Sequence, residues 1–270
     1  MRALAIVVLA GCAGAEAMTL PPQPAAPAAG SAVEAHDLGL FPGESMAFDV
    51  HLAGMLAGEA QLAVGEIGEY DHRRAIVVKS RAATAGAARL VKNIVDEATT
   101  TIDADTGRPL LLDTTVVMND KTSTAKATFT GSMADVTYTR PDDPKPHAYH
   151  VDFGKVTVYD SHSAMAQLRG WRAAAGTTKQ VYVVGGRRLW RVDLTFVGNE
   201  TVGSDLGNRK TVHLHGAAFH AKANLQIEAG NATRTFDVWI SDDADRVPIK
   251  MTAHTELGDV AMDLTEYNRP

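Results

Sequence analysis

Short runs in which apolar and polar residues alternate recur along most of this 270-residue chain, and they constrain its fold more than any other feature. In the first, MAFDVHL, Met46, Phe48, Val50 and Leu52 alternate with more polar neighbours. A period of two is typical of a strand with one buried face. Roughly a dozen such runs are punctuated by Gly- and Asp-rich pairs at hairpin spacing, without a βαβ rhythm. The sequence therefore predicts an all-β, mainly antiparallel fold: a partly closed barrel or a strongly bent sheet.

Two stretches break this pattern and predict short helices. AGAARLVKNIV, residues 85–95, has apolar residues at helical spacing, so we expect Leu90 and Val91 to pack in an amphipathic helix or a loop. SHSAMAQLRGW, residues 161–171, offers Ser161 as an N-cap before its apolar side. The proline-rich PDDPKPH at 141–147 is expected to be an exposed loop.

The chain has one cysteine, Cys12, at the end of an apolar run near its start. Arg2 precedes eight apolar residues (3–10), a length inside the ~7–15 of a signal-peptide core. LAGC at 9–12 resembles the lipobox of bacterial lipoproteins. This resemblance implies cleavage of a signal peptide (1–11) and lipid attachment at Cys12, including a fatty acyl chain such as palmitate. The alternative is an ordinary signal peptide with an incidental cysteine.

The remaining organisation is simple. Residues 12–37 are rich in Ala and Pro and predict a tether, and residues 38–267 predict a single β-rich domain. No uninterrupted apolar run is long enough for a spanning helix. A net charge of −6 argues against nucleic acid as a partner. We expect a protein of the bacterial envelope, anchored through Cys12. In enterobacterial lipoproteins an Asp after the cysteine favours the inner membrane; here Ala13 follows it, so by analogy we expect the outer membrane, facing the periplasm.

Two motifs resemble the bacterial domain-of-unknown-function family 3108. An opening FPGESMAFDV with a later G-x-A turn is matched by Phe41, Gly43, Glu44, Phe48, Gly58 and Ala60. A closing W-x-S-x-D-x-x-R-x-P-hydrophobic-K is matched by Trp239, Ser241, Asp243, Arg246, Pro248 and Lys250. The resemblance covers about residues 38–267 and implies a fold and an envelope setting, but no reaction. The closing motif is also similar to the final strands of the periplasmic lipoprotein-carrier proteins, which are open barrels around a helix.

Two clusters contain side chains of the kinds that bind metal ions. The run from Ser241 to Arg246 holds three carboxylates, which are suitable cation ligands, but it lacks the spacing of a calcium loop. We expect a hairpin turn in which Asp side chains cap backbone N–H groups, with Asp243 beside Arg246. His213 and His215 share a strand face, followed by His220. They lack a further ligand at defined spacing, so no metal and no cofactor are predicted.

No catalytic residue is assigned. The sequence has no Gly-x-Ser-x-Gly motif and no phosphate-binding loop. A glycosidase-type pair of carboxylates leaves no local trace in a sequence. Glu44, Asp49, Asp96 and Glu97 therefore remain open candidates for such a role.

The positions of the aromatic residues indicate which strand faces are covered. Trp190 shares a strand face with Val192, Leu194 and Phe196, whereas Trp239 falls on the nominally polar face of its strand. This placement predicts that both faces are partly covered, either by the 161–171 helix or by a ligand inside a barrel. The candidate ligand contacts are Trp171, Trp190 and Trp239.

Three hypotheses for function follow. The leading one is a membrane-anchored, non-enzymatic envelope lipoprotein whose barrel binds or escorts a lipid or another amphiphile. The second is a structural or interaction module for surface polysaccharide or outer-membrane assembly. The third is a glycan hydrolase or lyase. A lipid or glycan ligand and the membrane are the expected partners; the oligomeric state stays open.

Overall fold

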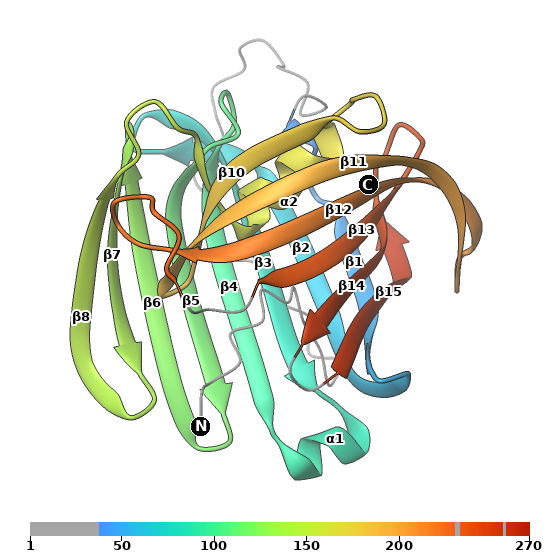
Figure 1. Cartoon of the computed structure of the whole chain (residues 1–270), viewed down its shortest axis with the longest axis horizontal. Helices are drawn as coiled ribbons and strands as arrows, with labels where there is room; N and C mark the ends of the chain where they lie inside the picture. Colours follow the sequence, from blue (N-terminus) through green and yellow to red (C-terminus); the bar gives the residue numbers. More distant parts are fainter. Residues whose placement is uncertain (1–37, 230–232, 256–257) are drawn as a thin grey trace.

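The computed structural model describes residues 38–229, 233–255 and 258–270; the expected signal peptide, Cys12 and tether lie outside them. Within these residues the chain forms 15 strands in one sheet and two short helices, α1 and α2 (Figure 1). The first eight strands are β1 (Ser45–Leu52), β2 (Met55–Tyr70), β3 (Arg73–Thr84), β4 (Ile94–Asp103), β5 (Pro109–Met118), β6 (Lys121–Thr130), β7 (Met133–Arg140) and β8 (Asp143–Asp152). The others are β9 (Val158–Asp160), β10 (Thr178–Gly185), β11 (Arg188–Ser204), β12 (Gly207–Ala221), β13 (Arg234–Ser241), β14 (Pro248–Thr255) and β15 (Gly258–Asn268). Helix α1 spans Gly86–Val91 and α2 spans Ser161–Gly170.

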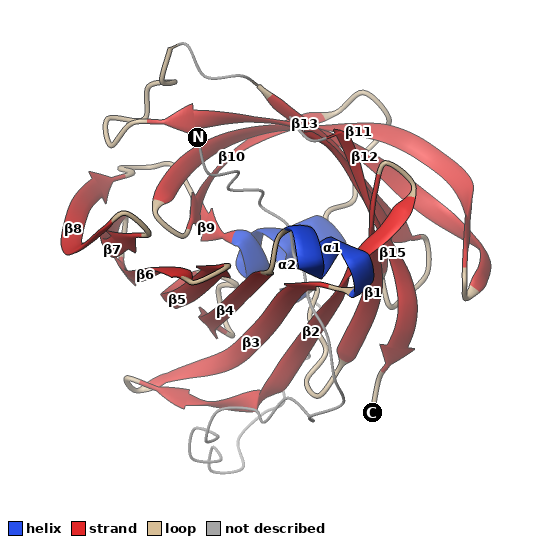
Figure 2. Cartoon of the chain, turned by 90° about the horizontal axis from the view of Figure 1, so that it is seen from below, coloured by secondary structure: helices blue, strands red, loops and turns tan. Residues whose placement is uncertain are grey.

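The sheet runs in the order β8-β7-β6-β5-β4-β3-β2-β1-β15-β14-β13-β12-β11-β10-β9. Every neighbouring pair is antiparallel except β9 and β10. The two edge strands of the sheet, β8 and β9, are not hydrogen-bonded to each other. The sheet nevertheless curves so strongly that it encloses an interior (Figures 1 and 2). This confirms the predicted mainly antiparallel, partly closed fold.

Side chains, rather than backbone hydrogen bonds, join the two ends of the sheet. One buried cluster combines residues of β5–β8 with Tyr182, Val184 and Leu189 of β10 and β11. Phe153, which follows β8, is 1% exposed, and its ring centroid lies 6.4 Å from that of Tyr182. Apolar packing therefore covers the side of the barrel where the hydrogen-bonded ladder stops.

The expectation of a loop at 141–147 is wrong in one respect: most of it belongs to strand β8. Arg140 and Asp143 face each other across the β7–β8 turn. Pro144 and Pro146 lack an N–H, which excludes them from most central strands, but β8 is a sheet edge and needs only one ladder. The segment is largely exposed, as predicted.

Helix α2 lies inside the curved sheet, between β1–β4 and β10–β13 (Figure 2). Its N-cap is Asp160 and not the predicted Ser161: the Asp160 side chain accepts from the backbone N–H groups of His162 and Ser163, and Ser163 completes a capping box. Ser161 is the first helical residue. No helix of the described residues is long and apolar enough to cross a membrane.

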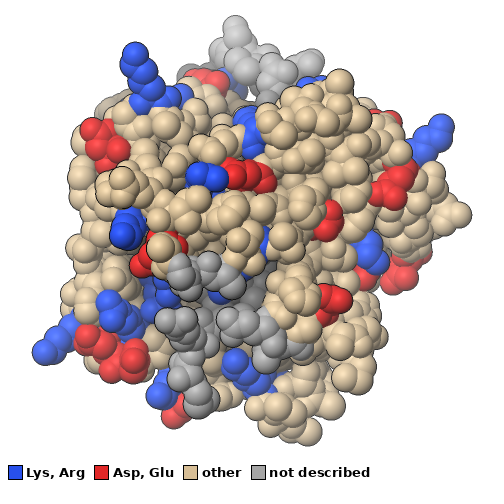
Figure 3. All heavy atoms as spheres, viewed as in Figure 1, with Lys and Arg blue, Asp and Glu red and all other residues tan. Residues whose placement is uncertain are grey.

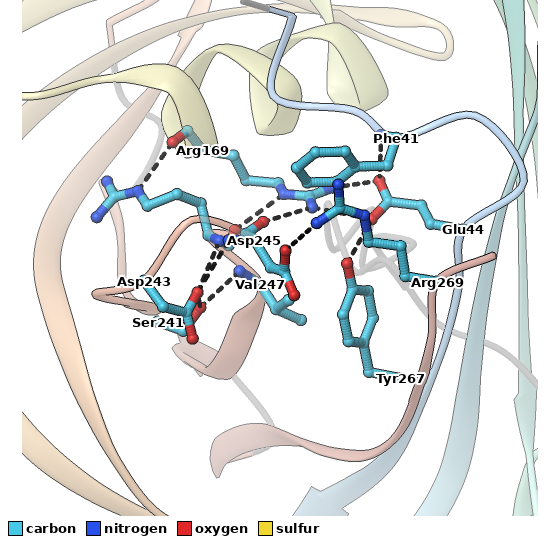
Figure 4. Close-up of polar contacts among 10 residues, drawn as sticks. Phe41, Glu44, Arg169, Ser241, Asp243, Asp245, Val247, Tyr267 and Arg269 are labelled. Atoms are coloured by element: carbon cyan, nitrogen blue, oxygen red, sulfur yellow. Dashed lines mark hydrogen bonds and ion pairs between the residues drawn. The ribbon is translucent and has the colours of Figure 1, made fainter. Parts of the chain in front are cut away.

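The C-terminal end of α2 is fixed by a buried ion pair, shown in Figure 4. The Arg169 guanidinium donates to both carboxylate oxygens of Glu44, at 2.5 and 2.9 Å, and to the backbone oxygens of Asp245 and Arg246. Arg246 in turn donates to the backbone oxygen of Arg169. Because both charges of the pair are buried, these additional hydrogen bonds are needed to offset their desolvation.

The segment before β1 packs on α2 at the same end. Leu38 and Leu40 join a buried cluster with Ala166 of the helix. Gly39 has a φ of +65°, and a Cβ there would lie 2.1 Å from the Ala166 carbonyl oxygen. A residue with a side chain cannot occupy this position without moving the segment off the helix.

Helix α1 confirms the helix expected within residues 85–95 but not the packing expected of it. It forms inside the predicted range, but none of its residues is buried. Leu90 and Val91, expected to pack, are 90% and 87% exposed. The apolar spacing of the segment is real, but none of its side chains is buried against the rest of the described chain.

Candidate functional site

An apolar cavity of about 380 Å³ lies between α2 and the inner faces of β10–β15. Its walls include Leu168 of α2, Val183 of β10, Leu194 of β11, Val238 of β13 and Met262 of β15. Protein interiors are normally packed to the density of organic crystals, whereas pockets for small ligands occupy about 300–1,000 Å³. The cavity is therefore large enough to be a binding site.

A glycine in β12 helps to shape this cavity. Gly216 lies opposite Phe236 of β13, and a Cβ on Gly216 would lie within 2.1–2.6 Å of the Phe236 ring. The ring therefore lies across the β12 backbone and lines the cavity. A larger residue at position 216 would force this ring to move.

Two of the three predicted tryptophans line the cavity. Trp190 is 1% exposed and belongs to the buried cluster with Val192, Leu194 and Phe196, which confirms that these residues share a face. Trp171, which follows α2, packs edge-on against Phe196 at a centroid distance of 6.3 Å.

Trp239 lies on the other face of β13, outside this cavity. Its ring stacks on His213, with centroids 4.6 Å apart, and its Nε1–H donates to Glu200 at 2.6 Å. The interior helix covers the opposite face, where Phe236 and Val238 join the same buried cluster as Leu168. The expectation that α2 covers the Trp239 face is therefore wrong: cross-strand side chains cover it.

The charged residues of the cavity lining are basic. Lys179 places its Nζ 5.8 Å from the ring centroid of Trp171, and the guanidinium carbon of Arg234 lies 4.9 Å from that of Trp190. His254 also lines the cavity. No Asp or Glu among the described residues does so. Exposed lining residues, including Thr233, Thr235 and His254, mark where the cavity meets solvent.

The histidine cluster forms a chain of hydrogen bonds on the outer face of the sheet. His213 and His215 share Asp237 Oδ1, at 2.7 and 3.0 Å, which confirms that the two rings lie on one strand face. The other nitrogen of His213 lies 2.9 Å from Glu200. His220 instead packs against Trp190, with centroids 4.1 Å apart. The described part of the chain contains no group of three His, Cys, Asp or Glu side chains suited to a metal ion.

The acidic run 241–246 is a turn, as predicted. Asp243 Oδ1 accepts from the backbone N–H groups of Asp245 and Arg246 and from the Ser241 hydroxyl (Figure 4). Asp243 thus binds the Arg246 backbone, while the Arg246 guanidinium reaches α2. Arg269 also pairs with Asp245. Motif residues at both ends of the domain therefore hold the helix in place.

The four candidate carboxylates are spread over different environments. Glu44 is bound by Arg169, and Glu97 pairs with Arg81 at 3.0 Å on the opposite face of β4 from Asp96. Asp49 lies on β1. Burial, and then the charge of Glu97, raise the pKa of Asp96 to about 7. None of these four residues lines the cavity beside α2 or the small pocket between Met46 and Met251, so neither of these two pockets holds the carboxylate pair expected of a glycosidase.

A buried polar chain anchors the start of α2. His162 Nδ1 lies 2.7 Å from Thr100 Oγ1, and His162 Nε2 lies 2.8 Å from Ser80 Oγ. Thr100 also donates to Asp160 at 2.5 Å. Burial lowers the pKa of His162, opposed by the nearby charge of Asp160. Sequence reasoning missed this cluster because strand and helix residues far apart in sequence build it.

A family model described as a protein of unknown function, DUF3108, matches residues 47–265. The chain belongs to the DUF3108 family. This confirms the resemblance carried by its opening and closing motifs. In this DUF3108 chain, Glu44, Asp243 and Arg246 of those motifs build the turn and the contacts of α2. The contacts of these motif residues are structural: they hold α2 and the turn in place and do not indicate a reaction.

Comparison with solved structures supports the same architecture. The DUF3108 chain is similar to a β-barrel-like protein of family DUF1849 from Brucella abortus, with a TM-score of 0.59 at 12% identity, covering 85% of this chain and 98% of that one. Weaker similarities are to a putative exported protein with a YmcC-like fold from Bacteroides fragilis (TM-score 0.38, 9% identity, 85% and 98% covered) and to the hypothetical lipoprotein YmcC from Escherichia coli (0.33, 10%, 88% and 90%). No curated protein sequence matches this chain. The likeness to the DUF1849 protein describes the fold alone.

Proposed function

We propose that this protein is a non-enzymatic envelope lipoprotein that binds an amphiphile with its apolar tail in the cavity beside α2. The observation that carries this proposal is the apolar cavity of about 380 Å³ inside an otherwise well-packed barrel. An apolar tail would replace water on its walls, a change worth about 25 cal/mol for each Å² of apolar surface buried.

The lining also indicates the chemical class of the head group. Lys179 and Arg234 contribute positive charge to the lining, beside Trp171 and Trp190. An anionic head, such as a fatty-acid carboxylate or a phosphate, would pair with such groups through charge-assisted hydrogen bonds. An anionic amphiphile therefore fits this site better than a neutral glycan.

The two alternatives have less support. A purely structural module would have its interior filled by side chains, whereas this cavity is open. A glycan hydrolase would need two carboxylates facing one cleft, and none of the four candidate carboxylates lines this cavity.

We also propose the cellular setting from the N-terminal sequence. Lipid attachment at Cys12 would hold the barrel at the bacterial envelope, on the periplasmic side of the outer membrane. Several acyl chains would make this attachment stable, since one chain alone holds a protein only marginally.

The test is mass spectrometry of lipids extracted from the full chain purified out of bacterial membranes. Ala253 lines the cavity, whereas Ala261 on the adjacent strand lies between the lining residues Val260 and Met262 and points to the other face. We expect a stoichiometric anionic amphiphile with the parent chain and with Ala261→Trp. The Ala253→Trp variant should lose most of it, because the indole fills the cavity.

An absence of bound amphiphile in the parent, or equal retention by both tryptophan variants, would refute the proposal. Thermal unfolding of each variant confirms that it is folded.

A further inference from the structure

Four large apolar side chains lie exposed at one end of the barrel. Met55 and Leu56, at the start of β2, are 71% and 53% exposed, and Leu90 and Val91 of α1 are 90% and 87% exposed. We call these four residues the apolar tip. Single exposed apolar residues are ordinary on protein surfaces, but a contiguous group of them marks an interaction site.

The two segments of the tip leave the sheet side by side. Gly58 of β2 faces Thr84 of β3, and beyond this pair the Ala85 N–H donates to the Ala57 oxygen at 3.0 Å. The β1–β2 turn and α1 therefore project from the same place, at the lower edge of the molecule in Figure 1.

Helix α1 is held to the sheet with its apolar residues outward. The Thr84 hydroxyl donates to the Lys92 oxygen at 2.9 Å and accepts from the Ile94 N–H at 3.0 Å, which closes the loop on both sides. Since α1 buries none of its residues, Leu90 and Val91 do not contribute to the core. Their exposure is a fixed feature of this loop.

The charge of the tip selects the kind of partner. Residues 85–92 contain Arg89 and Lys92 and no acidic residue, and residues 52–57 contain no charge. In the space-filling view, charges of both signs are interspersed over the face shown, while the region of α1 at the lower edge is mostly uncharged (Figure 3). Apolar side chains flanked by basic ones are typical of surfaces that insert into the head-group region of anionic bilayers.

The tip also lies next to the opening of the cavity. His254, an exposed lining residue, pairs with Asp259 at 2.7 Å, and the Asp259 oxygen accepts from the Ala53 N–H at 2.8 Å, two residues before Met55. We propose that the apolar tip inserts into an anionic lipid bilayer and places the cavity opening at its surface. This inference goes beyond ligand binding, because it concerns a separate surface of the molecule.

The expected anchor is compatible with this orientation. Cys12 precedes Leu38 by 26 residues, and a chain of that length can span up to about 90 Å when extended. Either end of the barrel can therefore reach the bilayer that holds the anchor.

The experiment uses the single cysteine of the sequence. Cys12→Ser gives a full chain without cysteine and without the lipid attachment site. Ala87→Cys in this chain then places an environment-sensitive fluorophore (NBD) on α1, at an exposed position beside the tip. Glu69→Cys, exposed at the other end of β2, is the matched control.

With vesicles of phosphatidylcholine and phosphatidylglycerol we expect the fluorophore at position 87 to brighten and shift to the blue, and the one at position 69 to stay unchanged. Adding Leu90→Asp and Val91→Asp should weaken vesicle binding at least ~10-fold, because two apolar side chains no longer enter the bilayer. Both residues are already exposed, so the melting temperature should not change.

The same response at both positions, or full binding by the Asp variant, would overturn the proposal. So would no response at position 87, which would leave a protein partner as the occupant of the tip. Ala253→Trp should bind vesicles like its parent, so failure of membrane binding is distinguishable from failure of ligand binding.

Discussion

The side chain that ties the start of α2 to the sheet is His162, which is fully buried between Thr100 and Ser80. Because burial lowers its pKa, the unfolded chain binds a proton more readily than the folded one. Its contribution to stability is therefore complete above about pH 6.5, the ordinary pKa of histidine, and is lost as the pH falls. We expect His162→Gln to lower the free energy of unfolding at pH 8 by about 1–3 kcal/mol and to reduce the decline between pH 6.5 and pH 5, measured by urea denaturation.

The matched control at this scale is His72→Gln, because the His72 side chain is 96% exposed in the β2–β3 turn. Its pH profile should follow that of the parent. Parallel profiles for the parent and His162→Gln would show that His162 does not set the acid limit of stability.

Strand β8 shows how an element at the edge of a sheet can still belong to the core. It forms one ladder, with β7, and the barrel closes beyond it through buried side chains such as Phe153. We expect Phe153→Ala to cost about 3–5 kcal/mol of unfolding free energy, the range for removing a buried aromatic ring, and to speed hydrogen exchange in β8. Val156→Ala is the control, since Val156 is 40% exposed, and should cost no more than about 0.5 kcal/mol. A similar small loss for both variants would mean that this contact does not hold the barrel closed.

At the scale of the whole molecule, the proposed lipid anchor and the apolar tip predict different behaviour when membranes are washed. A multiply acylated protein stays with membranes through washing, whereas insertion of a few side chains is reversible. In cells we expect Cys12→Ser to move the full chain from the alkali-washed membrane fraction to the soluble or unprocessed fraction, read on immunoblots. Ser31→Ala, also before the barrel, should leave the fractionation unchanged. Retention of Cys12→Ser in washed membranes would rule out the anchor.

Local backbone chemistry determined those parts of this protein that its sequence predicts. Alternation along the strands assigns a face to each residue, so it predicts that Trp190 and Phe196 lie on the same face, and both belong to one buried cluster. The turn at Asp243 is also predictable from local sequence, because its hydrogen bonds connect residues only two or three positions apart. The strand pattern also predicted the mainly antiparallel, partly closed architecture, and the family resemblance agrees with it.

The tertiary structure alone decided what covers each face. Alternation separates Trp239 from Val238 but cannot say which of them meets α2, since that depends on how 15 strands curve around the helix. The same holds for Leu90, whose helical spacing suggested packing although it lies exposed. The cavity, too, exists only because α2 and β10–β15 leave space between them, and packing between distant segments leaves no periodic trace in a sequence.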